Sequence, residues 1–301
     1  MNASTGGIAV ITGAASGFGL EACRIAARQG MKVVMADVQA DALDTASREI
    51  QDLGAQVLAR RTDVGKAAEI EALAAATLAR FGTPTFVFNN AGVGAGGLIW
   101  EQSPKDWEWV LGVNLMGVVH GVRVFTPLML AAAKADPAWR GHIVNTASMA
   151  GLVNMPNMGV YNVSKHAVVS LSETLYQDLA LVTDQVHAHL LCPFFVDTGI
   201  HVSQRNRPAD LTDAGAPSRS QQVQQAMTAK AVGSGKVSAA QVAQFVFDAM
   251  AAQRFYVFSH PQSLAGVQTR MEDVLQLRNP SDPFAARPQI GQQLRAALRG
   301  D

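Results

Sequence analysis

The chain has 301 residues, of which 49% are hydrophobic and only 16% are charged, and its 24 Lys and Arg balance its 24 Asp and Glu. A net charge of zero argues against nucleic-acid binding, which draws most of its affinity from cations on phosphates, and the apolar composition excludes intrinsic disorder. The two cysteines, Cys23 and Cys192, are too far apart to indicate a disulfide framework or a zinc motif.

Short apolar runs alternate with helical patterns along most of the chain. Strands are predicted over 7–12, 32–37, 56–60, 85–88, 141–146, 186–192 and 255–258. Helices are predicted between them, over 17–29, 40–53 and 66–81, and after a Ser103-Pro104 capping signal. This alternation is typical of βαβ units. The predicted fold class is therefore α/β, a doubly wound parallel sheet of about seven strands with helices on both faces.

The alternation predicts one domain for the whole chain, 1–301, because no linker interrupts a core of about 7–260. The polar segment 204–222 has neither helical nor strand periodicity and is predicted to be a substrate loop. Residues 261–301 form a C-terminal extension with a short helical pattern at 289–298.

Targeting signals are not evident in the sequence. Residues 1–7 lack the basic and apolar regions of a signal peptide. The most apolar long stretch, 117–133, is interrupted by His120, Arg123 and Pro127, whereas a membrane span needs about 20 predominantly apolar residues. We therefore expect a soluble, cytoplasmic protein that does not bind a membrane.

A glycine-rich turn follows the first predicted strand and opens the first helix. Gly13, Gly17 and Gly19 have the spacing GxxxGxG within TGAASGFG. Such glycines let the backbone turn sharply and approach a pyrophosphate, and the helix N-terminus offers free N–H groups. The alternative is an ordinary strand–helix turn without a ligand.

Asp37 closes the second strand, 18 positions after Gly19. This is close to the about 20 expected for an acid that binds the 2′-hydroxyl of a ribose. A carboxylate there would repel a 2′-phosphate, and neither Ser16, Val38 nor Gln39 is basic. The sequence therefore favours NAD over NADP, although Asp37 could also be the N-cap of the next helix.

Two more polar segments follow predicted strands. Asp63 and Val64 come after the third strand, and Asn89-Asn90-Ala91-Gly92 comes after the fourth. Ligands of open parallel sheets bind beyond the carboxyl ends of the strands. We expect these segments to face the same ligand as the glycine turn.

Tyr161 and Lys165 are four residues apart in a helical stretch, YNVSK, and Ser148 follows the fifth strand. Residues at this spacing share one helix face. A tyrosine and a lysine four residues apart also occur by chance on exposed helices. A phenol has a pKa of about 10, whereas a base useful at neutral pH needs about 7. A nearby lysine ammonium is expected to lower the pKa of the Tyr161 phenol, while Ser148 holds the substrate oxygen.

Together these motifs resemble the short-chain dehydrogenase/reductase family, in its compact oxidoreductase subtype with a Rossmann-type fold, over about residues 7–258. The resemblance implies catalytic roles for Asn114, Ser148, Tyr161 and Lys165. It implies cofactor contacts by Gly13, Ser16, Gly17, Phe18, Gly19, Asp37, Asp63, Val64, Asn90, Ala91, Gly92, Tyr161, Lys165, Pro193, Val196 and Thr198.

Several of these roles are specified by the resemblance. Asp63 and Val64 would flank the adenine, Asn90 would stabilise the central sheet, and Asn114 would help to hold a water for proton relay. In the segment PFFVDT, Val196 and Thr198 would contact the nicotinamide carboxamide.

The chain departs from the family pattern at two of these positions. Phe18 stands where the family usually has isoleucine, and Phe194 replaces a usual glycine after Pro193. We expect Phe194 to change the local backbone and to narrow the pocket.

Apolar side chains near the site segments suggest the substrate class. They are Met149, Met155, Met158, Phe194 and Phe195. As a group they predict an adaptable apolar pocket for a bulky apolar or aryl substrate, although each alone could simply fill the core. His187 and His189 face one side of a strand, but no third ligand stands nearby, so no metal site is predicted.

The predicted function is hydride transfer between NAD and a secondary alcohol or ketone. Two alternatives remain open: a 3-oxoacyl-type reductase of the same family and a non-catalytic dinucleotide-binding regulator. The resemblance also implies a homo-oligomer, a dimer or tetramer, that pairs the helices containing Asn114 and Tyr161.

Overall fold

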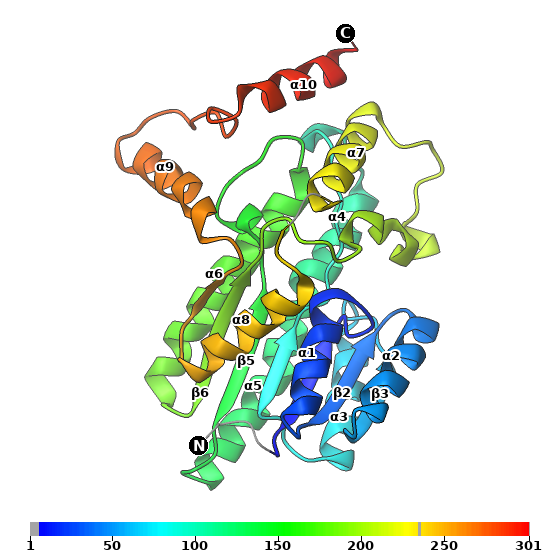
Figure 1. Cartoon of the computed structure of the whole chain (residues 1–301), viewed down its shortest axis with the longest axis vertical. Coiled ribbons are helices and arrows are strands. Elements are labelled where there is room, and N and C mark those ends of the chain that lie inside the picture. Colours follow the sequence, from blue (N-terminus) through cyan, green and yellow to red (C-terminus); the bar gives the residue numbers. More distant parts are fainter. Residues whose placement is uncertain (1–5, 234–235, 301) are drawn as a thin grey trace.

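The computed structural model describes residues 6–233 and 236–300 and is built around a seven-stranded sheet (Figure 1). The strands are β1 (Ile8–Thr12), β2 (Lys32–Asp37), β3 (Val57–Arg61), β4 (Phe86–Asn89), β5 (Gly141–Thr146), β6 (Val186–Cys192) and β7 (Tyr256–Phe258). They are all parallel, in the order β3-β2-β1-β4-β5-β6-β7. The chain reverses its direction of travel between β1 and β4, which opens a crevice at their carboxyl ends. The predicted doubly wound α/β fold is confirmed.

Helices cover both faces of this sheet. The helices are α1 (Gly17–Arg28), α2 (Ala40–Asp52), α3 (Ala67–Arg80), α4 (Pro104–Leu111), α5 (Gly117–Ala135), α6 (Gly159–Val182), α7 (Arg219–Gly233), α8 (Ala239–Ala251), α9 (Leu264–Leu275) and α10 (Pro288–Arg299). Short turns are η1 (Ile99–Glu101), η2 (Gly112–Met116), η3 (Met149–Gly151), η4 (Ile200–Asn206), η5 (Ala209–Leu211) and η6 (Pro261–Ser263).

The central strand shows why its sequence is apolar throughout. Ala9 and Ile11 point into a core formed with α1, α2 and α8, whereas Ile8 and Val10 point into a core formed with α3, α5 and α6. A parallel strand buried on both faces has no reason to alternate apolar with polar residues. All seven strands share this sheet, and a single domain over the whole chain stays a prediction.

The segment 204–222 differs from its prediction as a structureless loop. It contains the end of η4, all of η5 and the first turn of α7. Polar contacts with distant residues stabilise these turns, so local periodicity did not indicate them. The C-terminal extension forms α9 and α10, and α10 lies beside α7, away from the sheet (Figure 1).

A continuous helical segment, Pro104–Ala135, joins α4, η2 and α5. It is long and apolar enough to cross a membrane by length and composition alone. In this fold Phe125 and Met129 pack against the sheet. Only 28% of the most apolar window of this segment is buried, and the exposed positions of α5 include Arg123, Pro127 and Lys134.

Candidate active site

A cleft of about 720 Å³ lies beyond the carboxyl ends of the central strands. It brings together most of the predicted site residues, namely Gly13, Ser16, Gly17, Phe18, Asp37, Asp63, Val64, Asn90, Ala91, Gly92, Tyr161, Lys165, Pro193 and Thr198. Gly19, Asn114, Ser148 and Val196 do not line it. These four lie behind or beside the lining, as described below.

The glycine turn has the backbone that its sequence predicts. Gly13 and Gly17 have φ values of +65° and +53°, a region that favours glycine. A Cβ on Gly19 would lie 2.1 Å from the carbonyl oxygen of Gly13, so this glycine lets α1 start directly against the turn. The Ser16 side chain caps no N–H of α1. The free N–H groups and the positive dipole end of the helix therefore fit a pyrophosphate.

Asp37 holds its carboxylate at one end of the cleft. Its Oδ2 accepts a hydrogen bond from the Ala15 N–H at 3.0 Å, and its Oδ1 accepts one from the Gln39 N–H at 3.0 Å. Each oxygen keeps capacity to accept from a ribose hydroxyl. The N-cap of α2 is Gln39, so the alternative interpretation of Asp37 as that N-cap is wrong.

The segment after β4 is fixed by polar contacts at the switch between β1 and β4. The Thr12 hydroxyl accepts hydrogen bonds from the N–H groups of Asn90 (2.9 Å) and Ala91 (3.1 Å). The Asn90 amide donates back to the Thr12 carbonyl, and its Oδ1 accepts from the Thr146 hydroxyl. Asn90 thus links the ends of β1, β4 and β5, as the resemblance implied.

Lys165 is buried at the other end of the cleft. Its Nζ donates to the Thr146 carbonyl at 2.9 Å and lies 5.7 Å from the centre of the Tyr161 ring. Burial lowers the pKa of the Lys165 ammonium to about 8. Because that value is still above 7, the lysine is mainly protonated at neutral pH.

The Tyr161 phenol has a pKa above its ordinary value because it is buried, and a hydrogen bond with Ser148 acts in the opposite direction. Desolvation therefore dominates the pKa of this phenol, and a lowering by Lys165 stays a prediction. The Ser148 hydroxyl accepts from the Ala150 N–H at 3.1 Å at the start of η3. Ser148 thus lies beside the phenol, although it is outside the lining of the cleft.

Asn114 lies behind the cleft in the π-helical turn η2. Its Oδ1 accepts from the Val93 N–H at 2.8 Å, and its Nδ2 donates to the Val93 carbonyl and to the Ser164 hydroxyl. A Cβ on Gly92 would be 3.5 Å from this Oδ1 and 3.7 Å from Lys165 Nζ. A π-bulge in a helix often marks a functional position, and here it places Asn114 close to Lys165.

The segment 193–198 corrects one prediction. Phe194 packs edge-on against Phe195 and His260, with ring centroids 4.8 and 5.7 Å apart, and does not line the cleft. Phe194 does not have a positive φ, so its backbone does not require glycine. Phe194 therefore neither strains the backbone nor narrows this cleft. Val196 is buried in the core beside α1, and Thr198 lies against Gly17.

The predicted apolar substrate residues do not line the cleft either. Met149 is buried in the core with Leu190 and Cys192, while Met155 and Met158 are half-buried outside the lining. The main cavity is thus the cofactor end of the site. Met149 therefore fills the core, which is the alternative that its sequence position left open.

One wall of the cleft was predicted only in part, because residues 204–211 belong to the segment 204–222 that the sequence predicted as a substrate loop, whereas residues 199–203 were not predicted to belong to it. We call residues 199–213 the cover segment. It contributes Gly199, Ile200, Ser203, Arg205, Asn206, Arg207, Pro208, Asp210 and Leu211 to the lining, together with Glu108, Trp109, Gly112 and Val113. Its polar, aperiodic sequence indicated a loop near the ligand but not which part of the cleft the loop lines.

Cations near Asp37 were missed by the sequence analysis. Arg61 is the register neighbour of Asp37 on β3, with its guanidinium 3.6 Å from Glu69, and Arg205 Nε donates to Gln39 Oε1 at 3.2 Å. Both arginines line the cleft. Neither follows Asp37 in sequence, so inspection of the adjacent positions could not find them.

The histidines at the far end of the sheet form a hydrogen-bonded stack. His189 Nδ1 is 2.8 Å from the Arg254 carbonyl, so it donates, and its Nε2 accepts from His142 Nδ1 at 3.0 Å. Burial lowers the pKa of His142 to about 3 and that of His189 to about 4. Among residues 6–233 and 236–300, no group of three His, Cys, Asp or Glu could hold a metal ion.

Known proteins are similar to this chain over most of its length. A protein from Lactiplantibacillus plantarum described as a CLA biosynthesis dehydrogenase/reductase is 33% identical over 268 residues, 88% of this chain and 92% of that protein. A putative ketoacyl reductase from Streptomyces coelicolor is 34% identical over 204 residues, 68% of this chain and 76% of its own.

Among solved structures, a short chain dehydrogenase/reductase from Burkholderia phymatum in complex with NAD is 50% identical, with a TM-score of 0.91, and the match covers 95% of this chain and all of that one. The family model described as short chain dehydrogenase matches residues 7–209. On the fold, the cleft and these matches, the chain belongs to the short-chain dehydrogenase/reductase family.

Proposed function

We propose that this protein is an NAD-dependent oxidoreductase that transfers a hydride between nicotinamide and a secondary alcohol or ketone. One observation carries the proposal: the cleft joins the glycine turn and Asp37 at one end to Tyr161 and Lys165 at the other. A dinucleotide lying along it would have its phosphates at the N-terminus of α1 and its reactive ring beside the phenol.

Tyr161 is the proposed acid and base. In reduction its phenol donates a proton to the carbonyl oxygen of the substrate, and in oxidation the phenolate accepts the hydroxyl proton. The Ser148 hydroxyl donates a hydrogen bond to the same oxygen and orients it. The bound nicotinamide supplies or accepts the hydride.

Lys165 and Asn114 assist the phenol. The buried Lys165 ammonium stabilises the phenolate electrostatically once a substrate oxygen and a cofactor complete the site. Its contact with the Thr146 carbonyl fixes the position of its Nζ. Asn114, held by Val93 and Ser164, supports a water that relays protons to Lys165.

The proposed cofactor is NAD. The carboxylate of Asp37 is fixed by two backbone N–H groups, so it cannot easily turn away from a 2′-phosphate. Arg61 and Arg205 act against this preference because they bring positive charge to the same end. The similarity to a structure in complex with NAD supports the assignment.

The proposed substrates are bulky apolar or aryl secondary alcohols and ketones. The similarity to a putative ketoacyl reductase supports the alternative, a 3-oxoacyl-type reductase. A panel of alcohols, ketones and 3-oxoacyl thioesters, each assayed with NAD(H) and NADP(H), separates the two. Turnover of small polar sugars above apolar substrates would contradict the proposed class, and a clear NADP preference would contradict the role of Asp37.

Tyr161→Phe tests the catalytic assignment. We expect turnover to fall by about 10²- to 10⁴-fold, while NADH binding, measured by fluorescence, is retained. Tyr176→Phe, an exposed tyrosine on the same helix, is the matched control and should keep full activity. NADH binding by the wild type without turnover of any substrate would favour the non-catalytic regulator instead.

We further propose a cytoplasmic homo-oligomer. Met116, Val163 and Tyr176, on the helical segments that contain Asn114 and Tyr161, are exposed apolar side chains and support it, because a second copy would remove them from water. Light scattering of the purified protein tests this, and a monomer at micromolar concentration would contradict it.

A further inference from the structure

The cover segment, 199–213, lies across the part of the cleft where the adenosine of a dinucleotide would bind. Its residues line the cleft together with Asp37 and Asp63, which follow β2 and β3. Its base is fixed at the glycine turn, since a Cβ on Gly17 would lie 3.0 Å from Thr198 Cβ. The inference below concerns how this segment is held, and it rests on the proposed binding of NAD.

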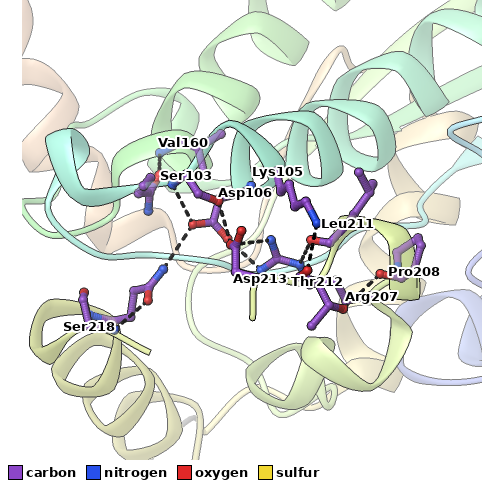
Figure 2. A network of polar contacts seen from close by, with 12 residues as sticks. Ser103, Lys105, Asp106, Val160, Arg207, Pro208, Leu211, Thr212, Asp213 and Ser218 are labelled. Carbon is purple, nitrogen blue, oxygen red and sulfur yellow. Dashed lines mark hydrogen bonds and ion pairs between the residues drawn. The ribbon is translucent and has the colours of Figure 1, made fainter. Parts of the chain in front are cut away.

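One edge of the cover segment is anchored by a buried ion pair. Arg207 Nη1 lies 2.7 Å from Asp106 Oδ1, and the two side chains are only 9% and 3% exposed (Figure 2). Asp106 is itself fixed, because its Oδ2 accepts from the Ser103 N–H in the capping box of α4. The anchor is therefore a carboxylate that the helix N-terminus has already oriented.

The same guanidinium organises the segment around itself. Arg207 Nε donates to the Leu211 carbonyl at 2.7 Å, and its Nη2 lies 3.4 Å from Asp213 Oδ2. Its central carbon lies 5.2 Å from the centre of the Trp109 ring. Asp213 in turn accepts from the Ser103 hydroxyl at 2.7 Å (Figure 2). Loss of Arg207 would thus remove several contacts of this turn at once, while the bonds from Ser103 to Asp213 and from Lys105 to the Thr212 carbonyl would remain.

The edge at Arg205 is held more weakly, although the nearby buried Ser203 hydroxyl accepts a hydrogen bond from the Gly94 N–H at 3.0 Å. The hydrogen bond from Arg205 to Gln39 is solvent-exposed and involves a neutral acceptor. It joins the cover segment to the start of α2, next to Asp37. An exposed hydrogen bond of this kind contributes far less than a buried, charge-assisted pair.

We propose that Asp106 and Arg207 are positioning residues for the bound dinucleotide. Their ion pair keeps the cover segment over the adenosine half of the cleft, and the cofactor enters and leaves through the Arg205–Gln39 edge. The segment swings about its α4 anchor while that anchor stays closed. Product release limits the turnover of many enzymes that close over their ligands. Here the rate of cofactor release depends on the difference in strength between the Asp106–Arg207 anchor and the Arg205–Gln39 edge.

The test is the dissociation rate of NADH from the full-length protein. Energy transfer from tryptophan to NADH reports binding, and excess NAD displaces NADH in a stopped-flow experiment. The variants are Arg207→Met, Asp106→Asn and Gln39→Ala, with Arg207→Lys as the conservative variant. Arg278→Met is the matched control, since Arg278 Nε pairs with Asp273 at 3.0 Å in the C-terminal extension, outside the cleft. Thermal unfolding is measured for each variant.

Arg207→Met and Asp106→Asn are expected to raise the NADH dissociation rate about tenfold or more, equivalent to about 1.4 kcal/mol. Arg207→Lys should recover part of this. Gln39→Ala should raise the rate about two- to fourfold without lowering the melting temperature, as expected for loss of one exposed hydrogen bond. Arg278→Met should change the melting temperature only.

Other outcomes distinguish a failure of the proposed function from a failure of the positioning role of Asp106 and Arg207. If the wild type does not bind NADH, the proposed function fails. If it binds NADH and folded Arg207→Met or Asp106→Asn releases it within twofold of the wild-type rate, the positioning role is wrong while the function stands. Should Arg207→Met fail to fold, Gln39→Ala decides: an unchanged rate overturns the exit at that edge, and an increased rate supports it.

Discussion

The floor of the cleft and its cover are built by different physical means. The floor consists of strand ends and the turn from Gly13 to Gly19, and its shape follows from backbone conformation and the absence of side chains. The cover depends on side chains far apart in sequence, above all the pair of Asp106 and Arg207, which are 101 positions apart.

This difference has a consequence for function. The floor is continuous with a sheet that is buried on both faces. In the proposed mode of cofactor exchange the cover moves at its outer edge, where the bond from Arg205 to Gln39 is exposed. Substitutions can therefore alter the floor, which binds the cofactor, without altering the cover, which controls cofactor exchange.

The largest effect is expected when a side chain is added to the floor of the cleft at a position with no room for it. Gly19→Ala places a Cβ 2.1 Å from the Gly13 carbonyl oxygen, so α1 must move away from the turn. We expect a loss of stability of about 3 kcal/mol or more and loss of NADH binding. Gly215→Ala, just beyond the cover segment, meets no atom within 4 Å and should change neither. Chemical denaturation measures both; equal stabilities would show that the floor adapts more readily than its geometry indicates.

The next effect concerns acid stability at the opposite end of the sheet. His142 and His189 have pKa values lowered to about 3 and about 4 by burial, whereas an unfolded histidine titrates near 6.5. The unfolded chain therefore takes up protons first as the pH falls, and stability decreases from about pH 6.5 downward. Each histidine contributes a loss of about 2 kcal/mol by pH 5, at about 1.4 kcal/mol per unit.

His142→Asn tests this, since its amide can still donate to His189. Its stability should fall less steeply than that of the wild type between pH 7 and pH 5, as measured by urea denaturation at each pH. Parallel curves for the two proteins would mean that the stack opens to water before it titrates.

A smaller effect is expected at the end of the floor nearest the cover. Asp37→Ala removes the proposed partner of the ribose hydroxyls and should weaken NADH binding about tenfold, or 1.4 kcal/mol. The affinity for NADPH should stay constant or increase, because Arg61 and Arg205 then face the 2′-phosphate without a competing carboxylate. Fluorescence titration with both cofactors measures the change. An equal loss for both would assign Asp37 a purely structural role through Ala15 and Gln39.

The smallest effect is expected for an exposed ion pair outside the cleft. Arg123 on α5 pairs with Glu71 on α3, and both side chains are about half exposed. Arg123→Met should cost less than about 1 kcal/mol, whereas removing Arg207 leaves the buried Asp106 unpaired at a cost of about 3 kcal/mol or more. Thermal unfolding of the two variants, measured side by side, gives the ratio of the two losses of stability. Equal costs would contradict the view that burial makes the cover anchor strong.

The sequence by itself determined the α/β fold, which motif follows which strand, and most of the cleft floor. It could do so because Gly13, Gly17 and Asp37 act through local backbone geometry and through the ends of strands, which neighbouring residues specify. The placement of Tyr161 and Lys165 in the cleft was also predictable, since both stand on one helix face.

Only the tertiary structure decided the rest. It turned Phe194 toward His260 and away from the cleft, made burial the dominant influence on the pKa of Tyr161, and brought Arg205 and Arg207 over the floor. Each of these results depends on contacts between residues distant in the chain, and on how much water those contacts exclude. Patterns among neighbouring residues indicate neither these long-range contacts nor the amount of water that they exclude.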